Sequence, residues 1–454
     1  MNRRVAIIAD NSIKYVENIL LAWKNGYSVV LLDSRIPHLK CVELLKDSNV
    51  EEVITDNIEL YQFAKEQHMI TTLIDNSKKV CKLPQYVYSQ YYYNESDKEA
   101  IVLFSSGTTG RNKGISLSHY SITTSAKKIM KIKNVNESSV LYIYKTFAHC
   151  ASFIGELMVA LISHAQMYIS PISTIMRKNI SNMIKYDVTH ISINPTIISL
   201  LNLDHKYYKF KKLEMVTCSG AILSKKMYCL SKKYFNCKII NSYGLTETSA
   251  MVTVKVDSEK SINEIMSVGK PLENIKVTIH DIHGKEKEVG EKGYIRIYSD
   301  TIYDGYITKE REKKKYFDTN DVGYIGENGE LYIIGRKDRM IISGAHNIFP
   351  ETIENILIDS GLVRECIVYA QKDEIYGQKI ICEYTLNKKE KKNSYEIKNS
   401  IYSICQKKLA KYEIPHKFVE KEKLEQTYSG KLKVEFIEGE INDKKHLAIN
   451  KSGF

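Results

Sequence analysis

Short apolar runs alternate with amphipathic stretches near the start of the chain. Strands are expected at residues 5–9, 27–32 and 50–55, with helices between them, the first ending near residue 24 and the second covering 35–47. Asn11 and Ser12 are of the types that cap a helix start, and Gly26 is of the type that ends one. This alternation of strand and helix is typical of a parallel sheet covered by helices.

The second half of the chain has a different pattern. Alternating residues at 277–297, with a polar turn at 281–284, predict antiparallel hairpins and a β-rich subdomain. Strands at 366–369 and 380–384, followed by a helix at 394–409, predict a smaller α+β unit. We therefore expect a multi-domain α/β fold, in which a large N-terminal domain of βαβ-type sheets carries the β-rich subdomain and a small domain follows.

Length and charge are consistent with this picture. A chain of 454 residues is long for one core and favours two or three domains. Its net charge of +12 suits anionic ligands such as nucleotides, CoA or an acidic carrier protein. Basic residues are not gathered with aromatic ones in any block, so the sequence does not favour nucleic-acid binding.

The cysteines and the N-terminal residues together predict the cellular compartment of the protein. The nine cysteines are scattered, and the absence of a C-x-x-C pair argues against a zinc site or a redox pair. Free thiols fit a reducing compartment, so we expect a cytoplasmic protein. The start, MNRRVAIIADNS, has too few apolar residues for a signal-peptide core, and no apolar run approaches a membrane span. The oligomeric state stays open, a homodimer included.

The stretch LFSSGTTGRNKGISLSH, residues 103–119, carries the strongest chemical signal. It follows an apolar run at residues 100–104 that predicts a buried strand, and it combines glycines, hydroxyl side chains and Lys113. Glycines bring backbone N–H groups close to an anion, hydroxyls add donors, and the lysine adds a full charge. These groups suit a nucleotide's phosphates, although an ordinary surface turn has a similar composition. The P-loop pattern does not fit, because no Gly-Lys here is followed by Ser or Thr.

This loop resembles the phosphate-binding loop of the adenylate-forming superfamily, which includes acyl-CoA synthetases, adenylation domains of peptide synthetases and beetle luciferases. The family's form is SGTTG followed by x-P-K-G, and Asn112 replaces the proline here. Four further stretches resemble the remaining family signatures in the family's order: NSYGLTETSA (241–250), YFDTNDVGYI (316–325), GRKDRMIISGAHNIFPETIE (335–354) and YSGKLK (428–433). In the second of these, Asn320 replaces the usual glycine of T-G-D, while Asp321 remains.

The resemblance implies a role for each matching residue. Lys431 is the implied catalytic lysine, and Glu247 is the implied Mg²⁺ ligand, with Thr246 beside the phosphates. His149 falls at the implied acyl pocket; the alternative is a buried histidine whose polar atoms are satisfied by backbone. The other implied residues are Ser105, Ser106, Gly107, Thr108, Thr109, Gly110 and Lys113 at the phosphates, Ser219, Gly220, Ala221, Asn241, Tyr243 and Gly244 at the adenine and substrate, Asp321 and Arg336 at the ribose, Asp338 at a hinge and Gly344 at the thiol tunnel.

The domain organisation also follows from the resemblance. It implies an ATP- and acyl-binding domain at residues 1–337, with a shorter start than most relatives have, and a mobile lid domain at 338–454 that carries Lys431. The implied reaction is activation of a carboxylic acid by ATP and Mg²⁺ to acyl-AMP, followed by thioester formation with CoA.

Alternatives to this reaction remain. A stand-alone adenylation enzyme that loads a carrier protein's phosphopantetheine, or a non-catalytic nucleotide-binding protein, stays open. Gly344 with Phe349 and Pro350 favours the acyl-CoA synthetase form. No cationic residue stands out at the pocket positions, so we expect an apolar acyl or aryl acid.

Overall fold

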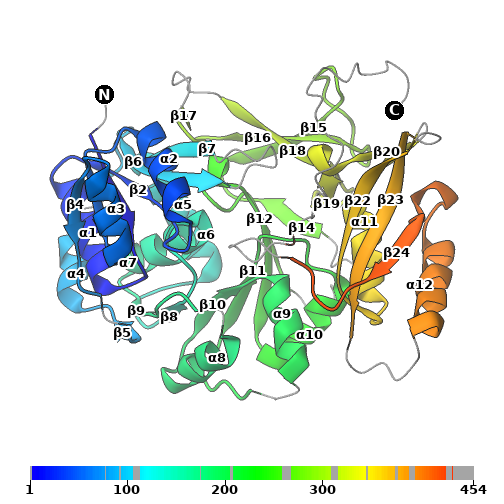
Figure 1. Ribbon diagram of the computed structural model, residues 1–454, viewed down its shortest axis with the longest axis horizontal. Helices are drawn as coiled ribbons and strands as arrows, with labels where there is room; N and C mark the ends of the chain where they lie inside the picture. Colours follow the sequence, from blue (N-terminus) through cyan, green and yellow to red (C-terminus); the bar gives the residue numbers. More distant parts are fainter. Residues whose placement is uncertain are drawn as a thin grey trace.

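The described residues form two large sheets and, toward the C-terminus, two smaller sheets of two and three strands (Figure 1). The computed structural model describes residues 3–76, 78–91, 94–105, 113–173, 175–204, 208–257, 267–307, 315–343, 346–373, 377–387, 394–425 and 432. None of the helices in these ranges is long and apolar enough to cross a membrane. None of the nine cysteines, all of which lie in these ranges, forms a disulfide.

The first sheet has the strand order β17-β7-β6-β2-β1-β3-β4. Its strands are β1 (Arg4–Ile8), β2 (Ser28–Leu31), β3 (Glu52–Thr55), β4 (Ile70–Leu73), β6 (Glu99–Ser105), β7 (Lys113–Ser118) and β17 (Gly305–Tyr306), and its first helices are α1 (Ile13–Lys24), α2 (His38–Ser48) and α3 (Ile58–Glu66). The run β6-β2-β1-β3-β4 is parallel, which confirms the predicted strand–helix alternation. The strands are apolar because helices cover them.

Local signals set the ends of these helices. Ser12 caps α1 by accepting a hydrogen bond from the Tyr15 N–H at 3.0 Å, and Gly26, with a φ of 76°, follows its end. The predicted start of the second helix near residue 35 was wrong, since α2 begins at His38. Pro37 explains the difference, because the residue before a proline is disfavoured in helical conformation.

The second sheet has the order β15-β16-β18-β19-β14-β13-β12-β11-β10-β8-β9-β5. Its strands are β5 (Cys81–Lys82), β8 (Val140–Ile143), β9 (Gln166–Ile169), β10 (His190–Ile193), β11 (Met215–Cys218), β12 (Lys238–Tyr243), β13 (Thr253–Val256), β14 (Ser267–Pro271), β15 (Ile275–His280), β16 (Gly293–Ser299), β18 (Tyr316–Ile325) and β19 (Leu331–Arg336). Strands β8 to β12 are parallel, and from β13 onward the pairing is antiparallel. The predicted β-rich subdomain is therefore real, and it is joined to the edge of the parallel sheet.

Helices associated with the second sheet bring its chemistry-bearing loops together. They are α4 (Gln85–Gln90), α5 (His119–Lys133), α6 (Cys150–Ser152), the π-helix η1 (Phe153–Met158), α7 (Val159–Ser163), α8 (Met176–Lys185), α9 (Pro195–Asp204), α10 (Lys225–Phe235) and the short 3₁₀ helix η2 (Thr246–Thr248). Helix α5 contacts β6 and β7 of the first sheet and also η1, which in turn contacts β8 of the second. The two sheets are thus linked through α5 and η1 (Figure 1).

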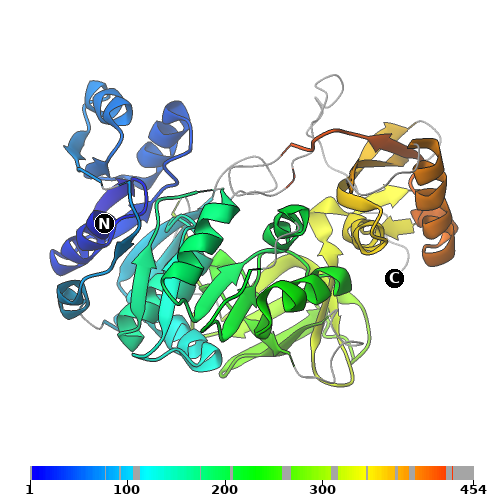
Figure 2. The same cartoon turned by 90° about the horizontal axis from the view of Figure 1, so that it is seen from below.

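The C-terminal part has its own core. It contains η4 (Lys337–Arg339), β20 (Ile341–Ser343), β21 (His346–Ile348), α11 (Pro350–Asp359), β22 (Val363–Asp373), β23 (Gly377–Leu386), α12 (Ser394–Lys408), η5 (Lys411–Glu413) and β24 (Lys417–Glu420). Buried Ile353, Leu357 and Ile401 pack in this core. The part lies at the opposite end of the molecule from β1 (Figures 1 and 2), and α11 approaches α10 through a hydrogen bond from Lys226 N to Asp359 Oδ1 of 3.2 Å.

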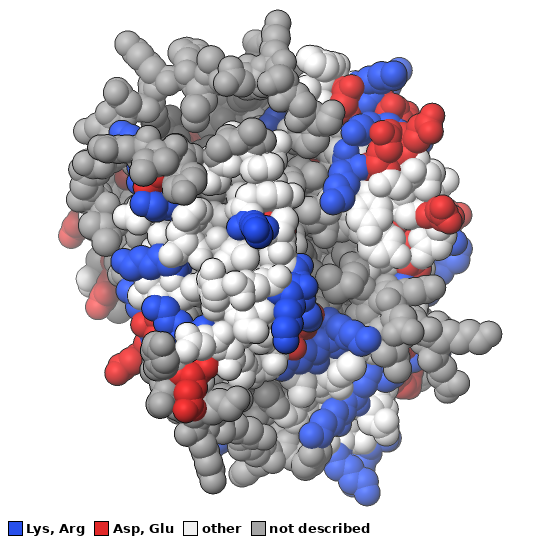
Figure 3. Space-filling model, turned by 90° about the vertical axis from the view of Figure 1, so that its right-hand side faces the viewer, with Lys and Arg blue, Asp and Glu red and all other residues white. Residues whose placement is uncertain are grey.

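The face at the C-terminal end mixes charges of both signs. Lys and Arg side chains gather toward its lower part, and Asp and Glu side chains lie at its upper right and lower left (Figure 3). The net charge of +12 therefore does not make this face uniformly basic.

Candidate active site

Lys113, Tyr306 and Glu247 come together from three separate elements. Lys113 begins β7, where it lies opposite Ser105 of β6, so the loop between these strands starts and ends beside this cluster. The Lys113 Nζ atom lies 5.2 Å from the centre of the Tyr306 ring, a cation–π distance. The Tyr306 hydroxyl donates to Glu247 Oε1 at 3.2 Å. Tyr306 had no signal in the sequence, because β17 contains only two residues.

The Glu247 carboxyl is buried, at 9% exposure. Burial raises its pKa, and a backbone N–H, the Tyr306 hydroxyl and the charges of Lys113 and Arg336 partly oppose this. The described residues contain no group of three or more His, Cys, Asp or Glu side chains that could hold a metal ion. A single carboxylate is compatible with Mg²⁺, which takes most of its ligands from phosphates and water when it accompanies a nucleotide.

Thr246 links this cluster to the loop that carries His149. Its hydroxyl donates to the Cys150 Sγ atom at 3.5 Å, and Cys150 directly follows His149 at the start of α6. Burial would raise the pKa of Asp33, but its hydrogen bonds with Arg35 bring this pKa below the usual value. The charge of His149 also lowers the pKa of Asp33. Asp33 and Arg35 belong to no motif, and their place beside His149 could not be inferred from the sequence.

A second cluster joins Tyr243, Asp321, Arg336 and Asp338. The Tyr243 hydroxyl donates to Asp321 Oδ2 at 2.6 Å, and Arg336 Nη1 lies 3.9 Å from Asp321 Oδ1. Arg336 also donates to both carboxylate oxygens of Asp338, at 3.0 and 3.1 Å. Burial and the Asp321 charge raise the pKa of Tyr243 well above its ordinary value, so the phenol keeps its proton and acts as a donor.

The adenine-side residues lie at the ends of two adjacent strands. Cys218 of β11 pairs with Asn241 of β12, so the Ser219–Gly220–Ala221 segment and Tyr243 leave the sheet at the same edge. The Ser219 N–H donates to the Ile193 carbonyl at 3.2 Å. The Asn241 side chain is buried and donates to the Ser267 carbonyl at 2.9 Å.

Two positions in this region favour glycine, each for a different backbone reason. A Cβ at Gly244 would overlap the carbonyl oxygen of Ala250, so glycine is required by close backbone approach. Gly220 has a φ of 85°, a conformation that favours glycine.

Some predicted site residues lie outside the described residues. These are Ser106, Gly107, Thr108, Thr109, Gly110, Gly344 and Lys431. The backbone of Ser105 is described, but its side chain is not. Their roles stay predictions. The structure does bring together Lys113 with Glu247, Thr246 with the His149 loop, and Tyr243 with Asp321, Arg336 and Asp338.

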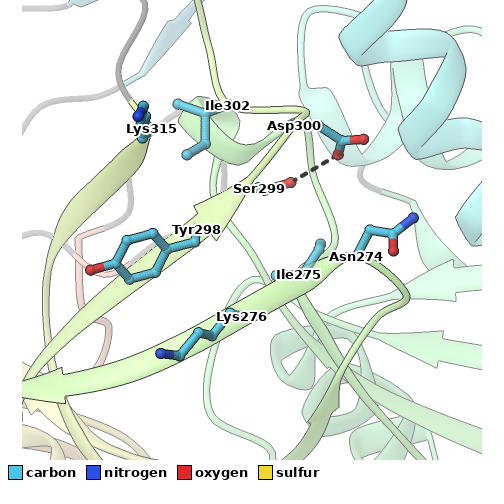
Figure 4. A pocket seen from close by; sticks show the side chains of 8 residues that line it. All are labelled: Asn274, Ile275, Lys276, Tyr298, Ser299, Asp300, Ile302 and Lys315. Carbon is cyan, nitrogen blue, oxygen red and sulfur yellow. Dashed lines mark hydrogen bonds between the residues drawn. The ribbon is translucent and has the colours of Figure 1, made fainter.

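A surface pocket of about 690 Å³ lies elsewhere, on the β-rich side of the molecule (Figure 4). It is lined by Asn274, Ile275, Lys276, Tyr298, Ser299, Asp300, Ile302 and Lys315. Hydrogen bonds hold two of these side chains in place. The Ser299 hydroxyl donates to Asp300 Oδ1, and Asp300 Oδ2 accepts from the Tyr120 hydroxyl of α5 at 2.8 Å. None of the predicted site residues that the structure describes lines this pocket, so we do not take it as the candidate active site.

Two family models match the sequence. The model described as AMP-binding enzyme matches residues 1–307, and the model described as AMP-binding enzyme C-terminal domain matches residues 352–431. The first match alone covers more than half of the chain.

Individual relatives agree with these matches. A 2-succinylbenzoate–CoA ligase from Geobacillus sp. (strain WCH70) is 27% identical over 436 residues, covering 94% of this chain and 85% of the relative. The solved structure of o-succinylbenzoate CoA synthetase from Bacillus subtilis, in complex with its acyl-adenylate intermediate, has a TM-score of 0.79 at 22% identity, covering 95% of this chain and 87% of the other. An anthranilate CoA ligase in complex with anthranoyl-AMP has a TM-score of 0.82 at 18% identity, covering 95% and 86%. These structural likenesses show the same fold. The chain belongs to the AMP-binding enzyme family, and with it to the adenylate-forming superfamily.

Proposed function

We propose that this chain activates an apolar acyl or aryl carboxylic acid with MgATP and transfers the acyl group to CoA. The observation that carries the proposal is the coupling of the two clusters: the charges of both Lys113 and Arg336 act on buried Glu247, while Arg336 also reaches Asp321. One continuous site can therefore hold phosphates at one end and a nucleoside at the other. The relatives that are CoA ligases, such as the 2-succinylbenzoate–CoA ligase, support the choice of acceptor.

The first half-reaction needs positioning rather than an enzyme nucleophile. The substrate carboxylate attacks the α-phosphorus of ATP, forming acyl-AMP and releasing pyrophosphate. Lys113 would hold the leaving pyrophosphate, and Tyr306 would orient the Glu247 carboxylate toward the metal. Bound Mg²⁺ would supply charge neutralisation at the phosphate oxygens. Lys431 would bridge the carboxylate and α-phosphate oxygens, which places its charge where negative charge develops.

The nucleoside would be held by the second cluster. The Tyr243 ring offers a flat surface for adenine, and the Asp321 carboxylate offers acceptors for the ribose hydroxyls. Asp321 accepts a hydrogen bond from the Tyr243 hydroxyl, and this bond fixes the ring and the carboxylate relative to one another. Asn241 would contribute through its amide, although one of its N–H groups is used by Ser267.

The second half-reaction replaces AMP by a thiol. The CoA sulfur attacks the acyl carbon of acyl-AMP, the C–O bond to AMP breaks, and the thiol proton is released. We place the hinge for this step at Asp338, whose carboxylate is held by Arg336 in the present arrangement. Rotation of the lid domain about Asp338 would withdraw Lys431 and open a path beside Gly344.

Acid-dependent pyrophosphate release tests the proposal. Purified protein with MgATP is offered a panel of fatty, aryl and amino acids, and release above the acid-free background is expected with at least one acyl or aryl acid. The active acid is then supplied with CoA or with a holo-carrier protein, and thioester is expected on CoA. Thioester formation on the carrier protein alone would identify the carrier, and not CoA, as the acceptor. If no acid caused pyrophosphate release, the proposal would be wrong.

A further inference from the structure

A buried lysine lies at the C-terminal end of α5, away from every sequence motif. Lys133 is 4% exposed, and its ammonium donates to the Gly155 carbonyl at 3.0 Å and to Ser192 Oγ at 3.4 Å. An ammonium has three N–H donors. The third has no partner among the residues that the structure describes.

A buried carboxylate lies close to this lysine without touching it. Glu156 of η1 is 3% exposed, and its Oε2 atom accepts no hydrogen bond from any described residue. Burial lowers the pKa of Lys133 to about 8, the Glu156 charge opposes this shift, and the Lys145 charge adds to it. Lys133 and Glu156 therefore interact electrostatically, while the hydrogen bonds that the described part of the chain gives the Lys133 ammonium go to Gly155 and Ser192.

Gly155, whose carbonyl accepts from Lys133, has room for a side chain. Gly155 is buried in η1, and a Cβ added there would meet no atom within 4 Å. A π-helix turn is wider than an α-helix turn and is frequent at functional sites. A lysine and a carboxylate that are both buried, separated and incompletely hydrogen-bonded are costly unless something bridges them.

The elements that hold the pair also contact residues of the candidate site. Ser125 of α5 donates to the carbonyl of Ser249, just after the Glu247 loop, and Lys133 follows about 12 Å further along the helix at 1.5 Å per residue. Helix η1 continues α6, whose Cys150 contacts Thr246. Strand β10, which carries Ser192, ends at Ile193, whose carbonyl accepts the Ser219 N–H. The same three elements thus connect the Lys133–Glu156 pair to the predicted substrate-side residues.

We propose that Lys133 and Glu156 form a specificity subsite that recognises a hydroxyl group at the far end of the acid substrate. A hydroxyl can accept from the Lys133 ammonium and donate to Glu156 Oε2 at the same time. A second carboxylate on the substrate could accept from Lys133 but would be repelled by the Glu156 carboxylate. A methyl group could form a hydrogen bond with neither residue. This subsite rests on the proposed function and narrows the apolar acid class to hydroxyacyl or hydroxyaryl acids.

Matched pairs of acids test the subsite. Benzoate is compared with 3- and 4-hydroxybenzoate, hexanoate with 6-hydroxyhexanoate, and hexanoate with adipate, by kcat/KM for pyrophosphate release. We expect a preference of at least about tenfold for one hydroxylated acid over its parent, because a hydrogen bond to a charged group carries a discrimination of that size. Lys133→Met and Glu156→Gln should each reduce this preference to less than about threefold while activity on the parent acid persists.

The controls separate recognition from folding. Lys127→Met lies on the same helix but removes a surface lysine that pairs with Glu95, so it should leave the preference unchanged. If Lys133→Met does not fold, Gly155→Ala provides a second variant, because the structure has space for the added methyl group. Filling that space should lower kcat/KM for the hydroxylated acid more than for its parent.

The outcomes distinguish the two proposals. If no acid releases pyrophosphate, the proposed function fails and the subsite fails with it. If parent and hydroxylated acids react equally, or adipate is preferred, pyrophosphate release is established but the hydroxyl subsite is wrong. Equal loss with both members of a pair in the Lys133→Met and Gly155→Ala variants would show that the pair only supports the fold, with water as its bridge.

Discussion

At the proposed nucleotide end of the site, side chains from distant motifs contact one another directly, whereas the buried polar side chains of the proposed acyl subsite are held apart. Tyr243 and Asp321 are 2.6 Å apart, and Arg336 contacts Asp338 at 3.0 Å. The Glu156 charge acts on Lys133, but the Lys133 ammonium donates to Gly155 and Ser192, and Glu156 Oε2 accepts from no described residue. The difference shows that the side chains at the proposed nucleotide end hold one another in place, while the proposed acyl subsite leaves polar atoms with which a substrate group could pair.

This contrast has a functional consequence. The nucleotide is common to every reaction of a given adenylating enzyme, so its partners should affect all acids to the same extent. The acyl partners should affect acids selectively. Variants at the two ends can therefore be separated by comparing kcat/KM across several acids rather than with one.

The largest effect is expected at Lys431. Lys431→Ala should lower acyl-AMP formation about 10²–10³-fold with every acid, because it removes a charge aimed at the reacting phosphate and carboxylate oxygens. Thioester formation from supplied acyl-AMP should largely survive, since Lys431 is withdrawn in that step. Single-turnover measurement of each half-reaction checks this, with Lys423→Ala as the exposed control. Equal loss of both half-reactions would contradict the assignment of Lys431 to the first step alone.

Glu247→Gln should come next. The neutral amide keeps the size of the side chain but loses the charge that would bind Mg²⁺, so pyrophosphate release should fall about 10²-fold for all acids. The Mg²⁺ concentration needed for half-maximal rate should rise as well. Glu327, which is exposed on the β18–β19 connection, provides a matched Glu→Gln control. An unchanged Mg²⁺ requirement would remove Glu247 from the metal site.

Asp321→Asn should have a smaller effect. It replaces the charged acceptor of the Tyr243 hydroxyl and of the ribose, so KM for ATP should rise about tenfold. The ratio of kcat/KM between any two acids should stay constant. Asp318→Asn, on the same strand but paired with Arg296 at the surface, is the control. A shift in acid preference would show that the two ends of the site are not independent.

The same contrast explains what the sequence could predict. The parallel strands, α1 and the β-hairpins follow from short-range patterns, and the nucleotide residues lie within motifs whose spacing is local. Tyr306 was missed because its strand has two residues, and β7 because a strand that begins within a motif has little pattern of its own. Pro37 was the visible signal that should have placed the start of α2 at His38.

The acyl end could not be predicted because its residues share no pattern. Lys133 ends an amphipathic helix, where a lysine is ordinarily solvated and stabilised by the helix dipole. Its burial depends on packing between α5 and η1, which are separate in the sequence but in contact in the fold. The sequence shows no cationic residue at the predicted pocket positions, and it gives no sign that a lysine at the end of α5 is buried.

The smallest effect is expected from Tyr306→Phe, and it concerns pH. The Tyr306 hydroxyl bond lowers the pKa of Glu247, which burial raises. Removing the bond should raise that pKa further, so the acid limb of the pH–rate profile should move to higher pH. The rate on the alkaline side of that limb should fall only about threefold to tenfold, the effect of one hydrogen bond to a charged group. Tyr86→Phe, which removes a surface bond to Glu17, should move neither quantity. A shift of the limb to lower pH would mean that Tyr306 stabilises the protonated carboxyl, and the ionised Glu247 would then lose its place as the metal ligand.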